Sequence, residues 1–398
     1  MKTSLITCFI TIFLFTNNYA QINTTMEKVN SILKEVKEKF APDKRVAIFI
    51  VETNQHSNKF ELKGETNLPE AKKYLEDALI KAGVSVDDNI NLLPSKELDG
   101  KTFGIINLSA ANIRSDSDHP AELATQAILG TPVKILKKGD DGYYLIQTPD
   151  GYIAWLDDDG FAAMNEKEFN DWLSAEKIIY TNDFGFSYSS ADQNSQRVSD
   201  LVIGNILKLN GEENNFYSVV YPDGRKAFIK KDEAKMFKDW YASLNPNGET
   251  ILQTAYRFMG VPYLWGGTSA KGMDCSGFTK TVYFLNGIIL PRDASQQVNA
   301  GDLIDTKDGW QNLQAGDLLF FGSKAKENRK EKITHVAIYI GDGDFIHAAG
   351  RVRINSLNAS KSYFSNYRNS SFIRAKRMLN TVDKGTQKIL ENSFYKSK

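Results

Sequence analysis

The chain has 398 residues, of which 41% are hydrophobic and 25% are charged. This length exceeds the usual range of a single hydrophobic core, so we expect two to four domains of an ordinary globular protein. Lys and Arg number 49 and balance the 49 Asp and Glu. The balance argues against nucleic acid or an anionic membrane surface as the main partner, because either would favour a basic excess.

The first twenty residues are typical of a secretory signal. Lys2 supplies a positive charge, Leu5 to Phe15 form an apolar run, and Ala20 is a small residue suited to cleavage before Gln21. The run is too short to span a bilayer as a helix, and no later stretch is long and apolar enough to be a membrane span. The sequence therefore predicts that residues 1–20 are removed and that the protein is exported, to the periplasm or the exterior.

Residues 21–103 have the pattern of a small α+β domain. Apolar residues at helical spacing predict a helix from Met26 to Phe40. Val46 to Val51 is a β-rich run, and Pro69 to Ala82 is typical of a second helix, which Gly83 ends. Nothing in this segment indicates chemistry.

The middle of the chain contains a weak internal repeat. Residues 135–159 and 206–233 share an apolar strand, a Gly/Asp/Asn turn, an aromatic-rich strand, a Pro-Asp-Gly turn and a further strand. Short strands with such turns predict a small β-barrel, and two copies predict tandem barrels. The repeats resemble the bacterial SH3-like domain, and we place the two domains at 104–165 and 166–246.

A breaker of sequence Asn-Pro-Asn-Gly at 245–248 marks the last domain boundary. It precedes a helix that we expect to begin near Glu249. The final domain is predicted at 247–380, and a charged tail at 381–398 is expected to be frayed. The residues that indicate catalysis lie in this final domain.

Cys275 is the single cysteine of the mature protein if the signal is removed, so it cannot form an internal disulfide. It lies in Asp-Cys-Ser-Gly at 274–277, between a glycine-rich approach and an amphipathic run. A cysteine at a helix N-terminus feels the partial positive charge of unpaired N–H groups, which favours thiolate over thiol. The same N–H groups can stabilise the oxyanion that forms when the thiolate attacks a carbonyl.

Two histidines are placed to assist that thiol. His335 opens an alternating run typical of a half-buried strand, and His347 lies on the returning strand after a Gly-Asp-Gly-Asp turn. The two can therefore lie near the same end of a sheet. A thiolate needs a partner base, and the base needs a third group that fixes its tautomer and orientation. Cys275, His335 and His347 can fill these three roles.

Two other uses of these side chains compete with nucleophilic catalysis. Cysteine and histidine bind metals, but one Cys and two His need a further ligand, and no Cys-x-x-Cys or His-x-x-x-His spacing supports such a site. Cys275 can also be a small buried core residue. Because two of the four histidines in the chain lie in this domain with the cysteine, we favour catalysis and expect neither metal nor cofactor.

These segments resemble the NlpC-type family of papain-like cysteine peptidases. The resemblance rests on Asp-Cys-Ser-Gly-Phe at 274–278, His-Val-x-Ile-Tyr-x-Gly at 335–341 and a second histidine twelve residues after the first, and it covers about 248–380. It implies a helical subdomain packed on an antiparallel sheet. Together with the N-terminal α+β unit and the two SH3-like barrels, this gives an α+β fold class for the chain. The resemblance also implies the roles of the three side chains: Cys275 as nucleophile, His335 as base and His347 orienting the base.

The resemblance further implies a substrate. The family cuts peptidoglycan stem peptides, commonly between D-Glu, through its γ-carboxyl, and a diamino acid. The domain order is similar to that of dipeptidyl-peptidase VI-type enzymes, which act on freed peptides that begin L-Ala-γ-D-Glu and require the free α-amino group. By this resemblance the substrate-binding residues include Tyr263, Trp265, Asp274, Ser276, Arg292 and Asp293.

The chemistry of such a peptide agrees with these residues. The free α-carboxylate of γ-linked D-Glu needs a cation or several donors, for which Arg292, Ser276 and backbone N–H groups are candidates. A free ammonium needs anions, which Asp293 and Glu122 can supply, with Tyr152 as an aromatic companion. In the competing interpretation the aromatic residues only pack, Arg292 and Asp293 form a surface pair, and Glu122 and Tyr152 are ordinary loop residues.

Three functions follow from the resemblance. The protein is a dipeptidyl-peptidase acting on small wall fragments, an endopeptidase acting on the intact wall with its barrels as wall-binding modules, or a non-catalytic or acyl-transferring relative. The neutral net charge disfavours strong adhesion to anionic wall polymers. The presence of nucleophile, base and orienting residue disfavours the third. We therefore expect a cysteine peptidase of peptides with a free N-terminal L-Ala.

Overall fold

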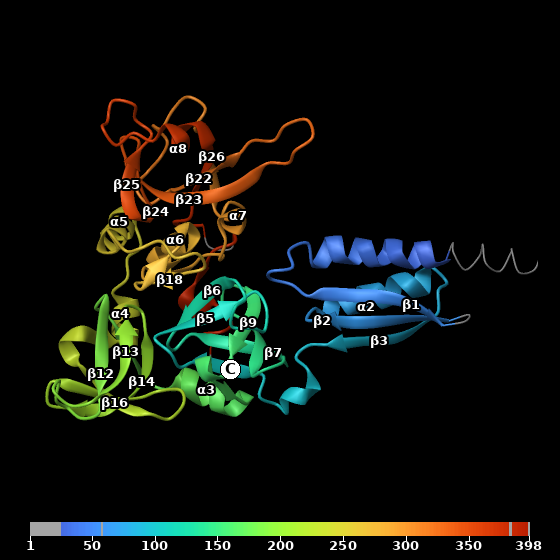
Figure 1. The fold of residues 1–398 in the computed structure, drawn as a ribbon, viewed down its shortest axis with the longest axis horizontal. Coiled ribbons are helices and arrows are strands. Elements are labelled where there is room, and N and C mark those ends of the chain that lie inside the picture. Colours follow the sequence, from blue (N-terminus) through green and yellow to red (C-terminus); the bar gives the residue numbers. More distant parts are fainter. Residues whose placement is uncertain (1–24, 57–58, 382–383, 397–398) are drawn as a thin grey trace, which may run out of the picture. The chain divides into compact units, whose positions relative to one another are not determined.

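The structure is a computed structural model that describes residues 25–56, 59–381 and 384–396 (Figure 1). The chain divides into two compact units, with the boundary in the sequence between Leu98 and Asp99. The predicted signal at 1–20 lies outside these residues. Within the described ranges, none of the helices has the length and apolar character needed to cross a membrane.

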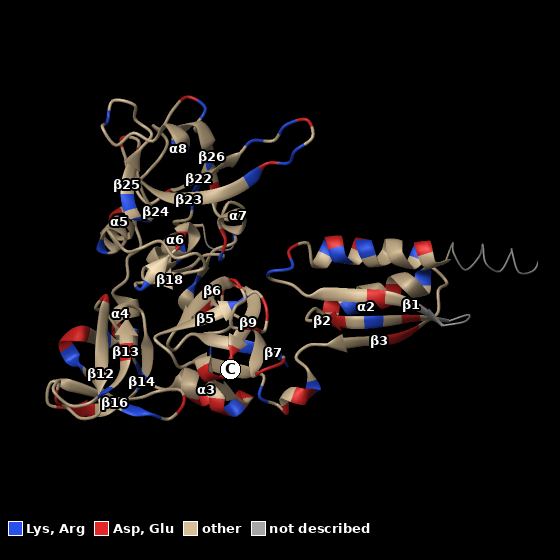
Figure 2. Cartoon of the chain, in the orientation of Figure 1, with Lys and Arg blue, Asp and Glu red and all other residues tan. Residues whose placement is uncertain are grey.

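The first unit is a three-stranded sheet with two helices against one face. Strands β1 (Phe49–His56) and β2 (Lys59–Thr66) pair antiparallel, and β3 (Val86–Leu92) pairs parallel with β2. The helix over residues 25–40 and helix α2 (Pro69–Lys81) bury their apolar sides in one core with the sheet. Figure 2 shows Lys and Arg interspersed with Asp and Glu along the first of these helices. Both predicted helices are confirmed.

The second unit begins with two seven-stranded sheets of the same topology. The strand order is β10-β4-β7-β8-β9-β5-β6 in the first sheet and, read from the matching edge, β17-β11-β14-β15-β16-β12-β13 in the second. Each strand of the second sheet thus occupies the place of the strand seven positions earlier. This identity confirms the internal repeat, and we call the sheets the first barrel (Phe103–Met164) and the second barrel (Lys177–Met236).

The repeated strands are short, as their turn-rich sequence predicts. Those of the first barrel are β4 (Phe103–Ile106), β5 (Ala110–Arg114), β6 (Leu123–Ile128), β7 (Pro132–Lys138), β8 (Tyr143–Gln147), β9 (Ile153–Asp157) and β10 (Phe161–Met164). Those of the second are β11 (Lys177–Tyr180), β12 (Phe184–Tyr188), β13 (Arg197–Val202), β14 (Ile206–Glu213), β15 (Phe216–Val220), β16 (Lys226–Lys230) and β17 (Ala234–Met236). Helix α3 (Glu166–Ser174) connects the barrels, and α4 (Phe237–Ala242) follows the second.

The C-terminal domain is an antiparallel sheet with helices on both faces. Its strand order is β21-β26-β22-β23-β24-β25. The bounds are β21 (Asp302–Ile304), β22 (Leu318–Ser323), β23 (Lys332–Gly341), β24 (Asp344–Ala349), β25 (Arg351–Ser356) and β26 (Phe372–Arg377). The helices are α5 (Gly248–Arg257), α6 (Cys275–Phe284), α7 (Ala294–Gln297) and α8 (Asn366–Ser371), and two short strands, β18 (Thr268–Ser269) and β19 (Gly272–Met273), precede α6.

Two apolar clusters hold this domain together. Helices α5 and α6 share a core with one face of the sheet, where Phe278 and Val282 of α6 meet Val336 of β23. The opposite face buries a second cluster that includes Phe321 and Phe345. The helical subdomain on an antiparallel sheet that the family resemblance implies is therefore present.

The tail segment (residues 384–396) corrects the expectation of a frayed end. Its β27 (Gln387–Lys388) pairs with β20 (Ile288–Ile289), which follows α6, and the Asn392 side chain donates a hydrogen bond to the Pro149 carbonyl of the first barrel at 2.8 Å. Ile389 is fully buried in a cluster with residues of the second barrel. The overall charge of the tail concealed these apolar side chains, whose burial fixes the segment in place.

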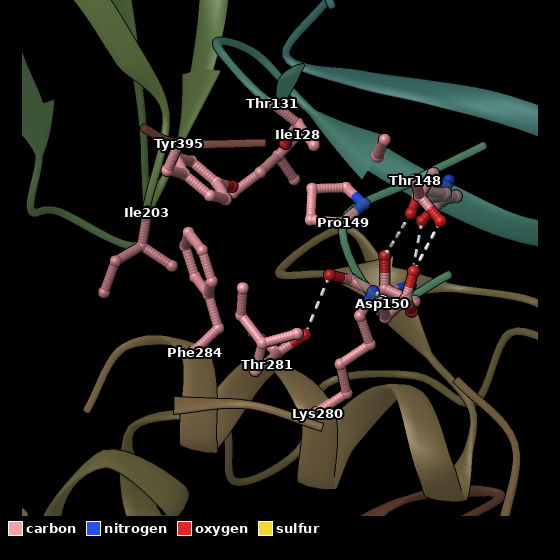
Figure 3. Close-up of a pocket in the computed structure, with 14 residues that line it drawn as sticks. Ile128, Thr131, Thr148, Pro149, Asp150, Ile203, Lys280, Thr281, Phe284 and Tyr395 are labelled. Carbon is pink, nitrogen blue, oxygen red and sulfur yellow. Dashed lines mark hydrogen bonds and ion pairs between the residues drawn. The ribbon is translucent and has the colours of Figure 1, made fainter. Parts of the chain in front are cut away.

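A cavity of about 60 Å³ lies where the two barrels, helix α6 and the tail segment meet (Figure 3). Its wall is largely apolar and includes Ile203, Phe284 and Tyr395. The charged exception is a buried ion pair in which Lys280 Nζ lies 2.6 Å from Asp150 Oδ2. Because Lys280 belongs to α6 and Asp150 to the Pro-Asp-Gly turn of the first barrel, the pair joins that barrel to the helix that begins with Cys275.

Candidate active site

Cys275 is the first residue of α6, and the start of this helix is tightly fixed. Asp274 caps it, since one carboxylate oxygen accepts the Gly277 N–H at 2.7 Å and the other accepts the Gly266 N–H at 3.0 Å. Gly277 permits the close packing, because a Cβ there would lie 2.0 Å from the Gly267 carbonyl oxygen. The sequence predicts that Asp274 binds substrate, whereas the structure engages both of its oxygens within the protein.

The Cys275 thiol is buried beside strand β23. The backbone N–H of Val336, the residue after His335, forms a hydrogen bond with the sulfur and favours its ionised form. The backbone N–H of Ser276 acts in the same direction from the start of α6. The fold thus brings the thiol to the strand that carries the predicted base.

His335 and His347 lie on neighbouring strands and form a directed chain of hydrogen bonds. Nε2 of His335 is 2.7 Å from Nδ1 of His347, and Nε2 of His347 is 3.0 Å from Oδ1 of Asn355 on β25. The Asn355 amide nitrogen donates to the Tyr363 carbonyl, which leaves its oxygen to accept from His347. His347 then accepts from His335, so Nδ1 of His335 is the ring nitrogen left free to take a proton.

Burial sets the resting protonation of these groups. It raises the pKa of the Cys275 thiol to about 11, with Asp274 adding to the rise. It lowers the pKa of His335 well below its ordinary value and that of His347 to about 3. The sequence predicts that the helix N-terminus favours the thiolate, but burial outweighs that effect here. The free site therefore holds a neutral thiol and a neutral imidazole.

Arg292 is buried and connects the start of α6 to the first barrel. Its Nη2 lies 2.6 Å from Asp274 Oδ2, Nη1 lies 3.0 Å from Ser276 Oγ, and Nε donates to Thr125 Oγ1 of the barrel at 2.8 Å. The interpretation of Arg292 and Asp293 as a surface pair is wrong, since Arg292 is 1% exposed. Its charge is balanced by Asp274, because a buried guanidinium needs a nearby anion.

Glu122 and Trp265 meet although 143 positions separate them in the sequence. The Trp265 indole N–H donates to Glu122 Oε1 at 2.5 Å. Glu122 precedes β6 of the first barrel, and Trp265 lies in the loop that leads to β18 and α6. The indole is 60% exposed, so this contact lies at an open surface. The structure thus brings two predicted substrate-binding residues together.

The other predicted substrate-binding residues lie around the same start of α6. Tyr263 is half-buried, and its pKa is raised by burial and by the nearby Cys275. Tyr152 is buried, and its hydroxyl group raises the pKa of the neighbouring Arg292. Asp293 precedes α7, where its backbone N–H donates to the Gln296 side chain. Tyr263 therefore lies near the thiol, whereas Tyr152 and Asp293 lie near Arg292.

Several residues of this region carry no signal that sequence reasoning could use. Asn355 ends the histidine chain, but it is an ordinary polar residue eight positions after His347. Gln126 of the first barrel accepts the Thr268 N–H at 3.1 Å, and its partner is set by tertiary packing alone. The partners of Lys280 and Asp150 likewise follow from docking of the barrel on α6 rather than from local pattern.

A thiol at a helix start beside a strand that bears a histidine, with a second histidine and an amide directing the ring, is the site of a cysteine-type hydrolase. The comparisons with known proteins agree. Residues 260–372 match the NlpC/P60 family, and residues 113–161 match the bacterial dipeptidyl-peptidase Sh3 domain.

Similar proteins match a longer part of the chain than either family model does. The chain is 33% identical over 234 residues to a gamma-D-glutamyl-L-lysine dipeptidyl-peptidase of Bacillus cereus, which covers 57% of this chain and 67% of the relative. A protein of the same name from Bacillus subtilis is 30% identical, with 57% and 72% covered. The crystal structure of an NlpC/P60 family protein from Bacillus cereus aligns with a TM-score of 0.59 at 26% identity, covering 70% of this chain and 99% of that one. The chain therefore belongs to the NlpC/P60 family of peptidases.

Proposed function

We propose that the protein hydrolyses the bond between γ-D-glutamate and a diamino acid in peptidoglycan-derived peptides that begin with a free L-Ala. The names of the two Bacillus relatives support this bond, and a third relative, from Lysinibacillus sphaericus, is named dipeptidyl-peptidase 6. The observation that carries the proposal is the contact of Glu122 with Trp265, which brings a carboxylate of the first barrel to the loop beside the thiol.

The chemistry follows from the orientation of the imidazole. Nδ1 of His335 takes the thiol proton as the sulfur of Cys275 bonds to the γ-carbonyl carbon and the carbonyl electron pair moves to oxygen. The oxyanion is stabilised by N–H groups at the start of α6. His335 then gives its proton to the leaving amine as the C–N bond breaks, which leaves a thioester. Water, deprotonated by His335, attacks the thioester and releases L-Ala-γ-D-Glu and the thiol.

His347 and Asn355 act through His335 rather than on the substrate. Because Nδ1 of His347 accepts from Nε2 of His335, the ring of His335 is held with its other nitrogen available for proton transfer. An amide at position 347 can still accept this hydrogen bond. We therefore assign His347 and Asn355 as positioning residues.

The first barrel supplies selection for the free amino end. Glu122 and Asp293 offer negative charge to the substrate ammonium from opposite domains, and acetylation removes that positive charge. Loss of one charge-assisted pairing costs about 2–5 kcal/mol, which corresponds to roughly thirty-fold or more in specificity. A chain inside an intact wall is substituted at this end, so selection for the ammonium distinguishes a dipeptidyl-peptidase from a wall endopeptidase.

The test compares kcat/KM for L-Ala-γ-D-Glu-L-Lys and its N-acetylated form. We expect the wild type to prefer the free peptide at least thirty-fold and Glu122→Gln to lose most of this preference. Glu213→Gln, on the second barrel, is the matched control and should behave as the wild type. Equal cleavage of both peptides by the wild type would favour the endopeptidase. Strong preference that survives Glu122→Gln would mean that another carboxylate binds the ammonium.

The proposal includes export, which rests on the sequence of residues 1–20 alone. The mass of the protein recovered from its native cells tests it. A mature chain that begins at Gln21 supports export, and a chain that retains residues 1–20 contradicts it.

A further inference from the structure

Arg368 of α8 is a half-buried arginine with no carboxylate partner. Its Cζ lies 5.5 Å from the centroid of the Phe321 ring, and the Phe321 ring lies 5.9 Å from the His335 ring. Across residues 25–56, 59–381 and 384–396, no Asp or Glu forms an ion pair with Arg368, and no side-chain hydrogen bond from its guanidinium is present. Five N–H donors that are partly removed from water are therefore left for water or a ligand.

A second arginine adds positive charge at the same place. Arg353 of β25 lies directly opposite His347 of β24, so their side chains share one face of the sheet. Burial is the main cause of the lowered pKa of Arg368, and Arg353 lowers it further, as expected for two cations that repel each other. Both arginines also lower the pKa of His335 and His347. An anion bound between them would remove this repulsion.

We infer that Arg368, with Arg353 beside it, binds the α-carboxylate of the diamino acid that leaves during cleavage. The inference rests on the proposed function. His335 must protonate the leaving nitrogen, so the groups packed around His335 face the leaving amino acid. The carboxylate is attached to the carbon that bears this nitrogen, which places it near the same groups. A guanidinium pairs with a carboxylate through two parallel hydrogen bonds, which fixes orientation as well as charge.

The other arginine near Cys275 does not compete for this role. Arg292 is already paired with Asp274 at 2.6 Å and is buried, whereas Arg368 is partly exposed. The inference predicts that the enzyme distinguishes peptides by their length. A tripeptide that ends at the diamino acid offers a free carboxylate to Arg368, but a peptide extended by one residue carries an uncharged amide at that position. The enzyme therefore prefers tripeptides.

Three peptides and three variants test this inference. The peptides are L-Ala-γ-D-Glu-L-Lys, its C-terminal amide, and the form in which the α-carboxyl of D-Glu is an amide. We expect the wild type to cleave the free acid at least tenfold more efficiently than the C-terminal amide. Arg368→Gln should remove that preference by slowing cleavage of the acid, and Arg368→Lys should retain part of it. Arg374 lies on β26 and pairs with Glu331. Arg374→Gln breaks this pair, is the control and should keep the full preference.

Each outcome separates this inference from the proposed function. If the wild type cleaves the free acid and the C-terminal amide equally well, the inference is wrong and the proposed function stands. If none of the three peptides is cleaved, the proposed function itself fails. If Arg368→Gln instead removes discrimination against the D-Glu amide, the bound group is the carboxylate of D-Glu, and the assignment to the leaving amino acid is overturned.

Discussion

The two barrels share a strand order and a Pro-Asp-Gly turn, yet the aspartates of these turns have different partners. Asp150 of the first barrel is buried and pairs with Lys280 of α6. Asp223 of the second barrel lies at the surface and pairs with Arg225, two residues along the same turn. Arg225 also donates to the Asn107 carbonyl of the first barrel at 3.0 Å. At these two turns, the first barrel thus pairs with the helix that begins with Cys275, and the second barrel pairs with the first.

The two barrels therefore share one fold but use equivalent turns for different contacts. Glu122 and Thr125 of the first barrel form hydrogen bonds with Trp265 and Arg292 of the C-terminal domain. Asp150 pairs with Lys280 of α6. We propose that this barrel is part of the active site. The second barrel supports the first and packs with Ile389 of the tail segment. Substitutions in equivalent turns should therefore have unequal effects, although the sequence pattern of the two turns is the same.

The largest expected effect on stability is at the buried turn. Lys280→Met leaves Asp150 buried without its cation and should reduce the free energy of unfolding by about 3–5 kcal/mol. Arg225→Met, at the exposed turn, should cost less than about 1 kcal/mol. Urea unfolding of the two variants measures the difference. Equal losses in the free energy of unfolding would contradict the proposed difference between the two turns. Lys280→Met should also weaken the preference for the free amino end, because it loosens the barrel that carries Glu122.

The histidine pair belongs to the C-terminal domain alone, and neither barrel contributes to its chain of hydrogen bonds in the described residues. His335→Ala should lower kcat/KM about 10²–10⁴-fold, since it removes the group that transfers protons. His347→Gln should lower it much less, because an amide can still orient the imidazole, and thermal unfolding should report that both variants are folded. Similar losses in the two variants would show that the base and positioning roles are assigned wrongly.

The smallest expected effect is on the reactivity of the thiol. Burial raises the pKa of Cys275 to about 11, so its thiolate is scarce at neutral pH. The rate of alkylation by iodoacetamide should therefore keep rising through pH 8.5, the ordinary pKa region of a free cysteine, and beyond it. Free cysteine in the same buffers is the control. A midpoint well below that of free cysteine would mean that Cys275 and His335 form an ion pair in the resting enzyme.

Local sequence patterns predicted the motif residues of this site, but they did not predict the contacts between distant segments. The cysteine and histidine motifs lie within short segments, so the sequence could indicate them directly. The repeat predicted tandem barrels because strand and turn signals are also local. The buried state of Arg292, the Asp150–Lys280 pair and the packing of the tail segment depend on contacts between distant segments. Identical Pro-Asp-Gly turns could not reveal which one would be buried.

The family resemblance predicted a substrate-binding residue, Glu122, that local sequence pattern alone does not indicate. Glu122 was named from a loop-like stretch more than 140 residues before Trp265, and the structure brings the two side chains into contact. Arg368 and Asn355 belong to no local sequence motif, and only the packing of the strands and α8 brings them near the histidines. The presence of an arginine in a sequence likewise does not indicate whether it forms an ion pair. Arg292 pairs with Asp274, whereas no ion pair of Arg368 is present in the described residues.

We propose that Cys275 cleaves the γ-D-glutamyl bond of a peptide with a free amino end. Incubation of the wild type and Cys275→Ala with L-Ala-γ-D-Glu-L-Lys, followed by mass spectrometry of the products, tests it most directly. We expect L-Ala-γ-D-Glu and free lysine from the wild type, and no product from a Cys275→Ala protein that unfolds at the wild-type temperature. Cleavage at the L-Ala bond, or cleavage by Cys275→Ala at even a tenth of the wild-type rate, would contradict it.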